Sequence, residues 1–275
     1  MSHRPMRLAI DHTTHYVFSG PVSRGLQRLR LKPKTSAGQR VLEWRMSFEG
    51  AQLQVEYDDA HCNHVALISF DQGVQEVTIR CEGLVATNDE AGIMGKHSGF
   101  VPMWQFLEPT DLTKVGPRIR SLASAVPQEG NTLATLHALS ALIRERVAYS
   151  TGHTNAETTA EGALAAGRGV CQDHAHVFIG AARSLGIPAR YVSGYLMMND
   201  RIEQDAGHAW AEAHVEGLGW VGFDVSNGIS PDARYVRVAT GRDYQDAAPI
   251  TGIRYGALDE TMHVKLAVEQ QRVEQ

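Results

Sequence analysis

The sequence is poor in several features that mark particular classes of protein. It has only three cysteines, an odd number that suits a reducing compartment and does not suit a disulfide framework. No apolar run approaches the length that crosses a membrane. The start, Met1–Arg7, carries charge but lacks the apolar stretch of a signal peptide after it. Together these absences predict a cytoplasmic protein without a membrane partner.

An excess of charge of one sign is also missing. The formal net charge is −5 over 275 residues, which disfavours nucleic acid as a partner. The hydrophobic content of 43% and the charged content of 21% are ordinary for a globular protein. The length allows one large domain or two modest ones.

The pattern of apolar residues changes along the chain. From Leu8 to about Thr87 the apolar segments are short and partly alternating, and turn residues separate them, which is typical of a β-sandwich. A glycine-containing linker follows, from Asn88 to about Pro109. Helical periodicity begins after it, so we predict a β-sandwich-like domain with its linker over residues 1–108 and a second domain over residues 109–275.

The stretch Gly167–His176 combines flexible backbone with a cysteine. Two glycines come just before Cys171, and the apolar residues after it recur at helical spacing until Gly186. Cys171 is therefore predicted at or beside a helix N-terminus, where unpaired N–H groups and the helix dipole favour negative charge. A thiol in that place loses its proton more easily, and the thiolate is the nucleophile. The alternative is a buried structural cysteine.

Two further segments predict an antiparallel hairpin. Gly207–Val215 and Trp220–Val225 alternate small and large residues, and Glu216–Gly219 has the composition of a turn. With the loop centred on Glu216, the facing pairs are Leu218 with His214, Trp220 with Glu212, and Asp224 with His208. Facing residues share one side of the sheet, so this register places an imidazole beside a carboxylate. A slip of one residue would separate the two groups.

Cysteine, histidine and aspartate in this arrangement supply a nucleophile, a base and a group that orients the base. The motifs that carry them are GVCQDHAH, SLGIPARYVSGY and GHAWAEAHVEGLGWVGFD. They resemble the bacterial transglutaminase-like superfamily, whose members are often described as candidate cysteine proteases. The resemblance is dense from Leu133 to Asn227. The opening HTTHY at His12–Tyr16 resembles the N-terminal β region that accompanies this core.

The resemblance implies an α+β fold: an N-terminal β-sandwich, then a papain-like or transglutaminase-like core in which the nucleophile helix packs on an antiparallel sheet. It implies Cys171 as nucleophile, His208 as general base and Asp224 as third member, with no cofactor and no metal. The expected reaction is acyl transfer from an amide of a peptide or protein substrate through a thioester. Hydrolysis is the expected outcome, and transglutaminase or deamidase activity is the alternative. The sequence departs from relatives at His174, where they often have an aromatic residue, and at Val225-Ser226, where they often have Pro-Thr.

Three other residues are candidates for the oxyanion site or the cleft. Gln172 follows the nucleophile, His174 shares a helix face with it, and Trp210 follows the base by two residues. Two alternative hypotheses about the function of the chain remain open. Cys171, His174, His208 and Asp224 together would be a zinc site, although the usual short-spaced ligand pairs are missing. The chain would otherwise be a non-catalytic binding module that retains an enzyme fold.

Overall fold

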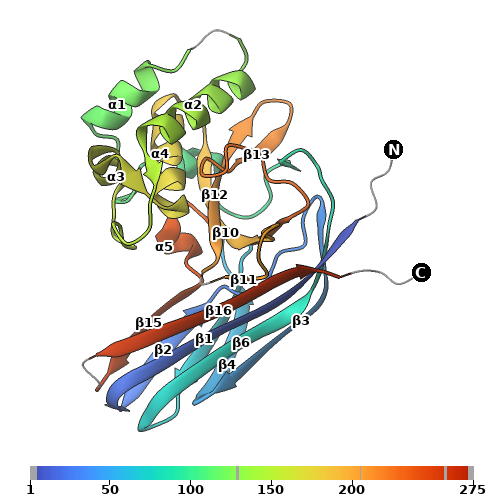
Figure 1. The fold of residues 1–275 in the computed structure, drawn as a ribbon, viewed down its shortest axis with the longest axis vertical. Coiled ribbons are helices and arrows are strands. Elements are labelled where there is room, and N and C mark those ends of the chain that lie inside the picture. The colour runs from blue at the N-terminus through green and yellow to red at the C-terminus, as the bar shows by residue number, and fades with distance from the viewer. Residues whose placement is uncertain (1–4, 128–129, 205, 257–258, 272–275) are drawn as a thin grey trace.

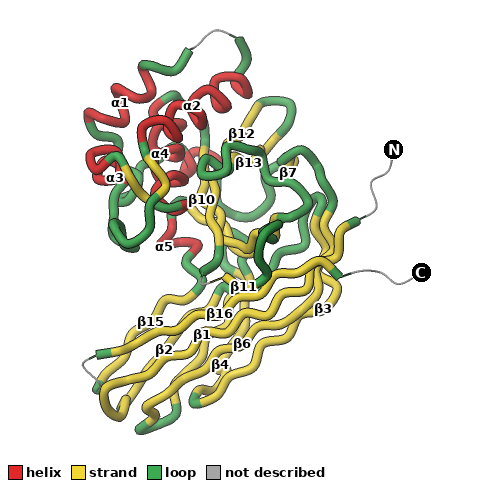
Figure 2. Tube along the Cα trace, in the orientation of Figure 1, coloured by secondary structure: helices red, strands yellow, loops and turns green. Residues whose placement is uncertain are grey.

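The structure is a computed structural model that describes residues 5–127, 130–204, 206–256 and 259–271. The helices gather at one end of the molecule and the longest strands at the other (Figures 1 and 2). The helices are a 3-10 turn at Met103–Phe106, α1 (Pro117–Ser124), α2 (Thr132–Arg146), α3 (Ala160–Ala166), α4 (Cys171–Ser184) and α5 (Tyr244–Ala247). No helix in these ranges is both long and apolar enough to cross a membrane.

The N-terminal region is a β-sandwich. One sheet has the order β11-β16-β1-β6-β3 and the facing sheet has the order β15-β2-β5-β4. Their strands are β1 (Met6–Val22), β2 (Arg24–Leu29), β3 (Gln39–Glu49), β4 (Ala51–Asp58), β5 (His64–Phe70), β6 (Val74–Thr87), β11 (Glu203–Gln204), β15 (Ile250–Tyr255) and β16 (Glu260–Gln270). Burial alternates along β1, so Tyr16 and Phe18 point into the same core as Ile68 of the other sheet.

In the second region, α4 packs on another sheet, and α1, α2 and α3 pack in turn against α4. This sheet has the order β14-β10-β12-β13-β7. Its strands are β7 (Ile93–Gly95), β10 (Ala189–Leu196), β12 (His208–Val215), β13 (Gly219–Phe223) and β14 (Tyr235–Gly241), and a short parallel pair, β8 (Ala148–Tyr149) and β9 (Arg168–Gly169), lies apart from it. Phe178 of α4 stacks on Phe223 of β13 with ring centroids 5.0 Å apart. Each such fully buried side chain contributes roughly 1.5–3 kcal/mol.

The last two strands return to the N-terminal sandwich. β16 pairs with β1 from Leu8 opposite Gln270 to Phe18 opposite Glu260, and β15 pairs with β2. The predicted division into residues 1–108 and 109–275 therefore misplaces these strands, because they complete the first region and not the second. The α+β fold class is confirmed, with an N-terminal β region beside a helix-covered antiparallel sheet.

Candidate active site

Cys171 is the first residue of α4 and is partly exposed. Val170 precedes it in extended conformation, and its N–H donates to Asp173 Oδ2 at 2.7 Å. Gly169 is required here, because a β-carbon on it would lie 2.6 Å from the Asp173 side chain. The sequence thus brings a thiol to the end of a helix whose first N–H groups have no helical partner.

His208 begins β12 and forms a short hydrogen bond with Asp224. The distance from His208 Nε2 to Asp224 Oδ2 is 2.6 Å, and both side chains are buried. Asp224 Oδ2 also accepts hydrogen bonds from Asn227 Nδ2 and from the Tyr235 hydroxyl, each at 2.7 Å. The carboxylate is therefore held from three sides and orients the imidazole.

The Cys171 side chain lies against the same imidazole. Burial lowers the pKa of His208, but hydrogen bonds to Asp224 and Cys171 and the negative charges of both outweigh burial and raise it to about 10. Burial also raises the pKa of Asp224, but the hydrogen bond and charge of His208, with Asn227 and Tyr235, hold it below its usual value. The arrangement favours an imidazolium between the Cys171 sulfur and the Asp224 carboxylate.

The predicted hairpin forms, but its register is shifted by two residues. Trp220 faces His214, and Gly222 faces Glu212, where Trp220 was expected. The loop is centred on Gly217, because Gly217 and Gly219 both adopt positive φ of 82° and β13 starts only at Gly219. A shift of two keeps every side chain on its face, so His208 and Asp224 still meet, although not as directly facing residues.

Of the three cleft candidates, only Gln172 lies at the site. It lines the same cavity as Cys171 and His208, and its side-chain amide donates to Ala156 O at 3.4 Å. His174 is buried away from the cavity, with its ring nitrogens bonded to Ser226 Oγ and Val147 O at 2.8 Å each. Burial lowers the pKa of His174, so it is a neutral structural link between α4 and two loops.

Trp210 also lies outside the cavity. It is 3% exposed and supports the imidazole from behind, with its ring centroid 6.2 Å from that of His208. It also packs edge-on against Tyr235. Its contribution is to hold the base and the residue that anchors Asp224.

A cavity of about 340 Å³ opens beside Cys171. The core supplies Tyr191, Ser193 and Tyr244 to its wall, and the sandwich supplies side chains from β1, β16 and the segment after β2. The N-terminal region therefore forms part of the candidate site. Figures 1 and 2 show why: the helix-covered sheet sits directly on the sandwich.

Two family models match this chain. The transglutaminase-like superfamily matches residues 120–225, and the bacterial transglutaminase-like N-terminal region matches residues 8–86. Together they cover more than half of the sequence. The chain thus carries a transglutaminase-like superfamily core beside a bacterial transglutaminase-like N-terminal region. The recognition based on the cysteine, histidine and aspartate motifs is thereby confirmed.

Similar proteins extend over nearly the whole chain. An uncharacterized protein of Mycobacterium leprae is 29% identical over 266 residues, covering 91% of this chain and 94% of the relative. An uncharacterized protein of Mycobacterium tuberculosis is 28% identical over 276 residues, covering 90% and 88%. A crystal structure from Cytophaga hutchinsonii, of a protein provisionally named a cysteine protease, has a TM-score of 0.80 at 21% identity and covers 100% of this chain and 93% of that one. That likeness establishes the fold.

Other residues of this transglutaminase-like site were not predicted from the sequence. Asn227 and Tyr235 both bind Asp224, and Arg30 lines the cavity from the sandwich. Asn227 follows Asp224 by three residues, a spacing typical of a side-chain capped turn that offered a local signal. Tyr235 and Arg30 reach the site only through the fold.

The zinc reading requires ligands that the fold separates. Both ring nitrogens of His174 are engaged elsewhere, so His174 does not join Cys171 and His208. Among the described residues, no three His, Cys, Asp or Glu side chains are grouped so as to hold a metal ion. The bonds made by His174 therefore disfavour the zinc hypothesis.

Proposed function

We propose that this transglutaminase-like protein cleaves amide bonds by cysteine-dependent acyl transfer, with Cys171, His208 and Asp224 as its catalytic residues. The observation that carries the proposal is the 2.6 Å bond between His208 and Asp224, on an imidazole whose protonated form Cys171, at a helix start, also stabilises. A nucleophile, a base and an orienting group in contact are the requirement for covalent catalysis.

The chemistry follows from these positions. The Cys171 thiolate attacks the carbonyl carbon of the amide, and N–H groups at the start of α4 stabilise the oxyanion. His208 donates its proton to the leaving nitrogen, so the carbon–nitrogen bond breaks and a thioester remains. His208, now neutral, takes a proton from water as the water attacks, which releases a carboxylate and regenerates the thiol.

Water is the proposed acyl acceptor, and an amine is the alternative. Of its described residues, the segment before His208 contributes Ala206 and Gly207 to the cavity wall, and Ile202, its one large apolar residue, is 52% exposed. A transferase must exclude water from its thioester until an amine arrives. No large apolar side chain among the described residues of this segment lines the cavity beside Cys171, so hydrolysis is favoured over transamidation.

The charge of the cavity suggests which peptide or protein substrates are preferred. Arg30 is 5% exposed and lines the cavity; its Nε donates to Asp59, while its Nη1 has no hydrogen-bond partner in the structure. No Asp or Glu is among the described residues that line this cavity. A substrate with a carboxylate near the scissile amide would supply the missing acceptor.

The test is a peptide library incubated with the protein and a primary amine, with products identified by mass spectrometry. Hydrolysis should dominate at millimolar amine, and peptides with glutamate near the cleaved bond should be cut faster than the same peptides with glutamine. Cys171→Ala should abolish turnover, whereas Cys62→Ala, which changes an exposed cysteine outside the site, should not.

Each outcome addresses a separate part of the proposal. An amine adduct as the major product would identify a transglutaminase and leave the catalytic residues in place. Turnover that survives in Cys171→Ala would refute the catalytic assignment.

The free thiols and the thiolate mechanism fit the reducing cytoplasm that the cysteine count predicts.

A further inference from the structure

A second hollow, of about 430 Å³, lies outside the catalytic cavity and is rich in cations. Its lining side chains include five that are cationic: Lys32, Lys34, Lys96, Arg190 and Arg237. Asp58 is the one acid among the described lining residues, and it is well exposed and lies 3.6 Å from His64 Nδ1. None of these residues lines the cavity beside Cys171.

The two buried arginines of the hollow, Arg190 and Arg237, share a single carboxylate. Glu212 is fully buried and binds both guanidinium groups, with 2.6 Å to Arg190 Nε and 2.8 Å to Arg237 Nε. Arg190 is further held over the ring of Trp220, 3.9 Å from its centroid. One carboxylate thus faces two buried cations.

Lys34 adds a further positive charge to this group. Its Nζ donates to His61 O at 2.6 Å and to Thr240 Oγ1 at 3.0 Å, both neutral, and it forms no ion pair with a described carboxylate. Burial, with the charges of Arg237 and Arg190, lowers the pKa of Lys34 well below its usual value. The four groups carry a net charge of +2 when Lys34 is protonated, which is costly in a buried site without an anion.

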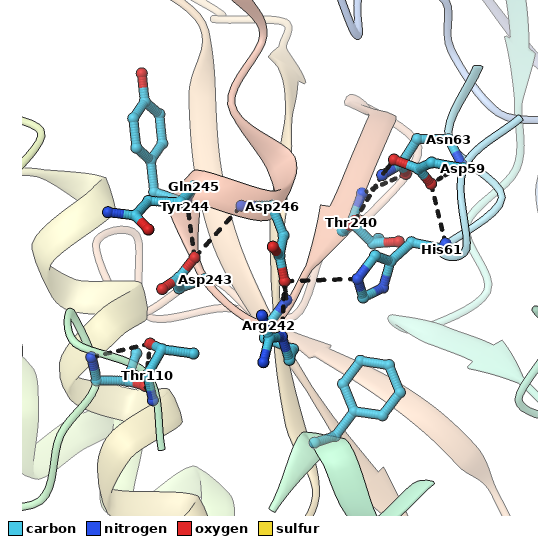
Figure 3. A network of polar contacts seen from close by, with 12 residues as sticks. Asp59, His61, Asn63, Thr110, Thr240, Arg242, Asp243, Tyr244, Gln245 and Asp246 are labelled. Atoms are coloured by element: carbon cyan, nitrogen blue, oxygen red, sulfur yellow. Dashed lines mark hydrogen bonds and ion pairs between the residues drawn. The ribbon is translucent and has the colours of Figure 1, made fainter. Parts of the chain in front are cut away.

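A network of polar contacts fixes His61, which lines the hollow, to the residues beside it (Figure 3). The turn at Asp59–Asn63 is fixed to the end of β14, because the Asn63 side chain exchanges two 2.8 Å hydrogen bonds with the Thr240 backbone. His61 reaches Asp246 at 3.5 Å, and Asp246 binds Arg242 at 2.9 Å. Lys34 is therefore held by a preformed site, and not by a loop that must fold around a ligand.

We propose that this hollow, framed by Lys34, Arg190 and Arg237, binds a phosphate dianion, either free or as the monoester group of a small molecule. A phosphate monoester carries about −1.5 to −2 at neutral pH, which matches the net +2 of the buried group. Arg190 of β10 and Arg237 of β14 keep terminal N–H groups that Glu212 does not bind, and Lys34 adds an ammonium from the segment between β2 and β3, so donors converge from three directions, as tetrahedral oxyanions require. The volume is typical of small-molecule sites, and exposed Lys96 lies at its rim.

The experiment is calorimetric titration of the full chain with inorganic phosphate, glycerol 3-phosphate and glycerol, at constant ionic strength. Saturable one-to-one binding of the phosphates is expected, with no binding of glycerol. Tighter binding of glycerol 3-phosphate would identify a monoester site, and equal or weaker binding would identify free phosphate as the ligand. Lys34→Met should weaken binding at least about tenfold and Lys96→Met about two- to fivefold.

Matched variants separate this result from loss of folding. Lys114→Met changes an exposed lysine elsewhere and should bind phosphate as the wild type does. Lys96→Met tests the site even if Lys34→Met unfolds, because Lys96 is exposed. No saturable binding of either phosphate, or equal binding by wild type, Lys34→Met and Lys96→Met, would overturn the proposal. Amidase activity is not part of this test.

Discussion

Strand β12 carries two buried charge clusters, and they differ in what their charges can do. At its start, His208 lies between Cys171 and Asp224. Four residues later on the same face, Glu212 lies between Arg190 and Arg237. The buried side chain of Trp210 stands between them along the strand.

The difference lies in which groups titrate. The first cluster holds an imidazole and a thiol that can exchange a proton, and it opens to a cavity. The second pairs the Glu212 carboxylate with two guanidinium groups, and although burial lowers the pKa of Arg190 to about 10, that pKa stays well above neutral. Burial raises the pKa of Glu212, but Arg190 and Arg237 lower it to about 2. The two buried clusters on β12 therefore differ: the groups around His208 can exchange a proton, whereas the groups around Glu212 keep an excess of positive charge.

The largest expected effect comes from removing the acceptor that orients His208. Asp224→Asn keeps the shape but places an amide at a carboxylate's position, so kcat should fall by roughly 10–10⁴-fold. Steady-state kinetics on a cleavable peptide measures this, and circular dichroism confirms folding. Asp111→Asn, at an exposed aspartate, is the control. A folded, fully active Asp224→Asn would contradict the assignment of Asp224.

A change in the second cluster should alter the stability of the protein. Glu212→Gln leaves two buried guanidinium groups without a carboxylate, so the free energy of unfolding should fall by about 3–5 kcal/mol. Urea unfolding measures the change, with exposed Glu145→Gln as control. Added phosphate should stabilise Glu212→Gln more than wild type, because the variant has a greater excess of positive charge. An unchanged stability would show that Glu212 does not neutralise this cluster.

Raising the pH should remove the stabilisation that the charged His208 imidazole provides. The pKa of His208 is raised from 6.5 to about 10, so its stabilisation is fully present below pH 6.5 and is lost as the pH rises through about 10. We expect wild type to lose on the order of a few kcal/mol more than His208→Gln between pH 6.5 and 10. Parallel pH profiles of unfolding free energy would contradict the ion pair.

The smallest expected effect is a difference among the three thiols. Limiting iodoacetamide at about pH 6 should label Cys171 at least about tenfold faster than Cys62, because only the thiolate reacts. Cys81 is fully buried, and burial raises its pKa to about 12, so it should react last. Peptide mass spectrometry gives the three rates. Equal labelling of Cys171 and Cys62 would remove the argument for an activated nucleophile.

Local signals explain what could be predicted. The helix start at Cys171 follows from two glycines and an apolar repeat, and each of these acts within a few residues. The pairing of His208 with Asp224 was predicted because strand periodicity places both on one face, even though the register was wrong by two. That error came from the backbone of Gly217 and Gly219, whose positive φ moved the loop centre.

By itself, the sequence determined the two kinds of region, the nucleophile helix and the face of the hairpin, since periodicity and turn chemistry act over short distances. Only the tertiary structure decided where the last strands go, because β16 joins β1 across most of the chain and local patterns do not encode such pairing. The same holds for Tyr235 on Asp224, for His174 turned away from the site, and for Lys34 beside Arg190 and Arg237. These groups meet because packing brings distant segments together, and burial then sets the charge that each one carries.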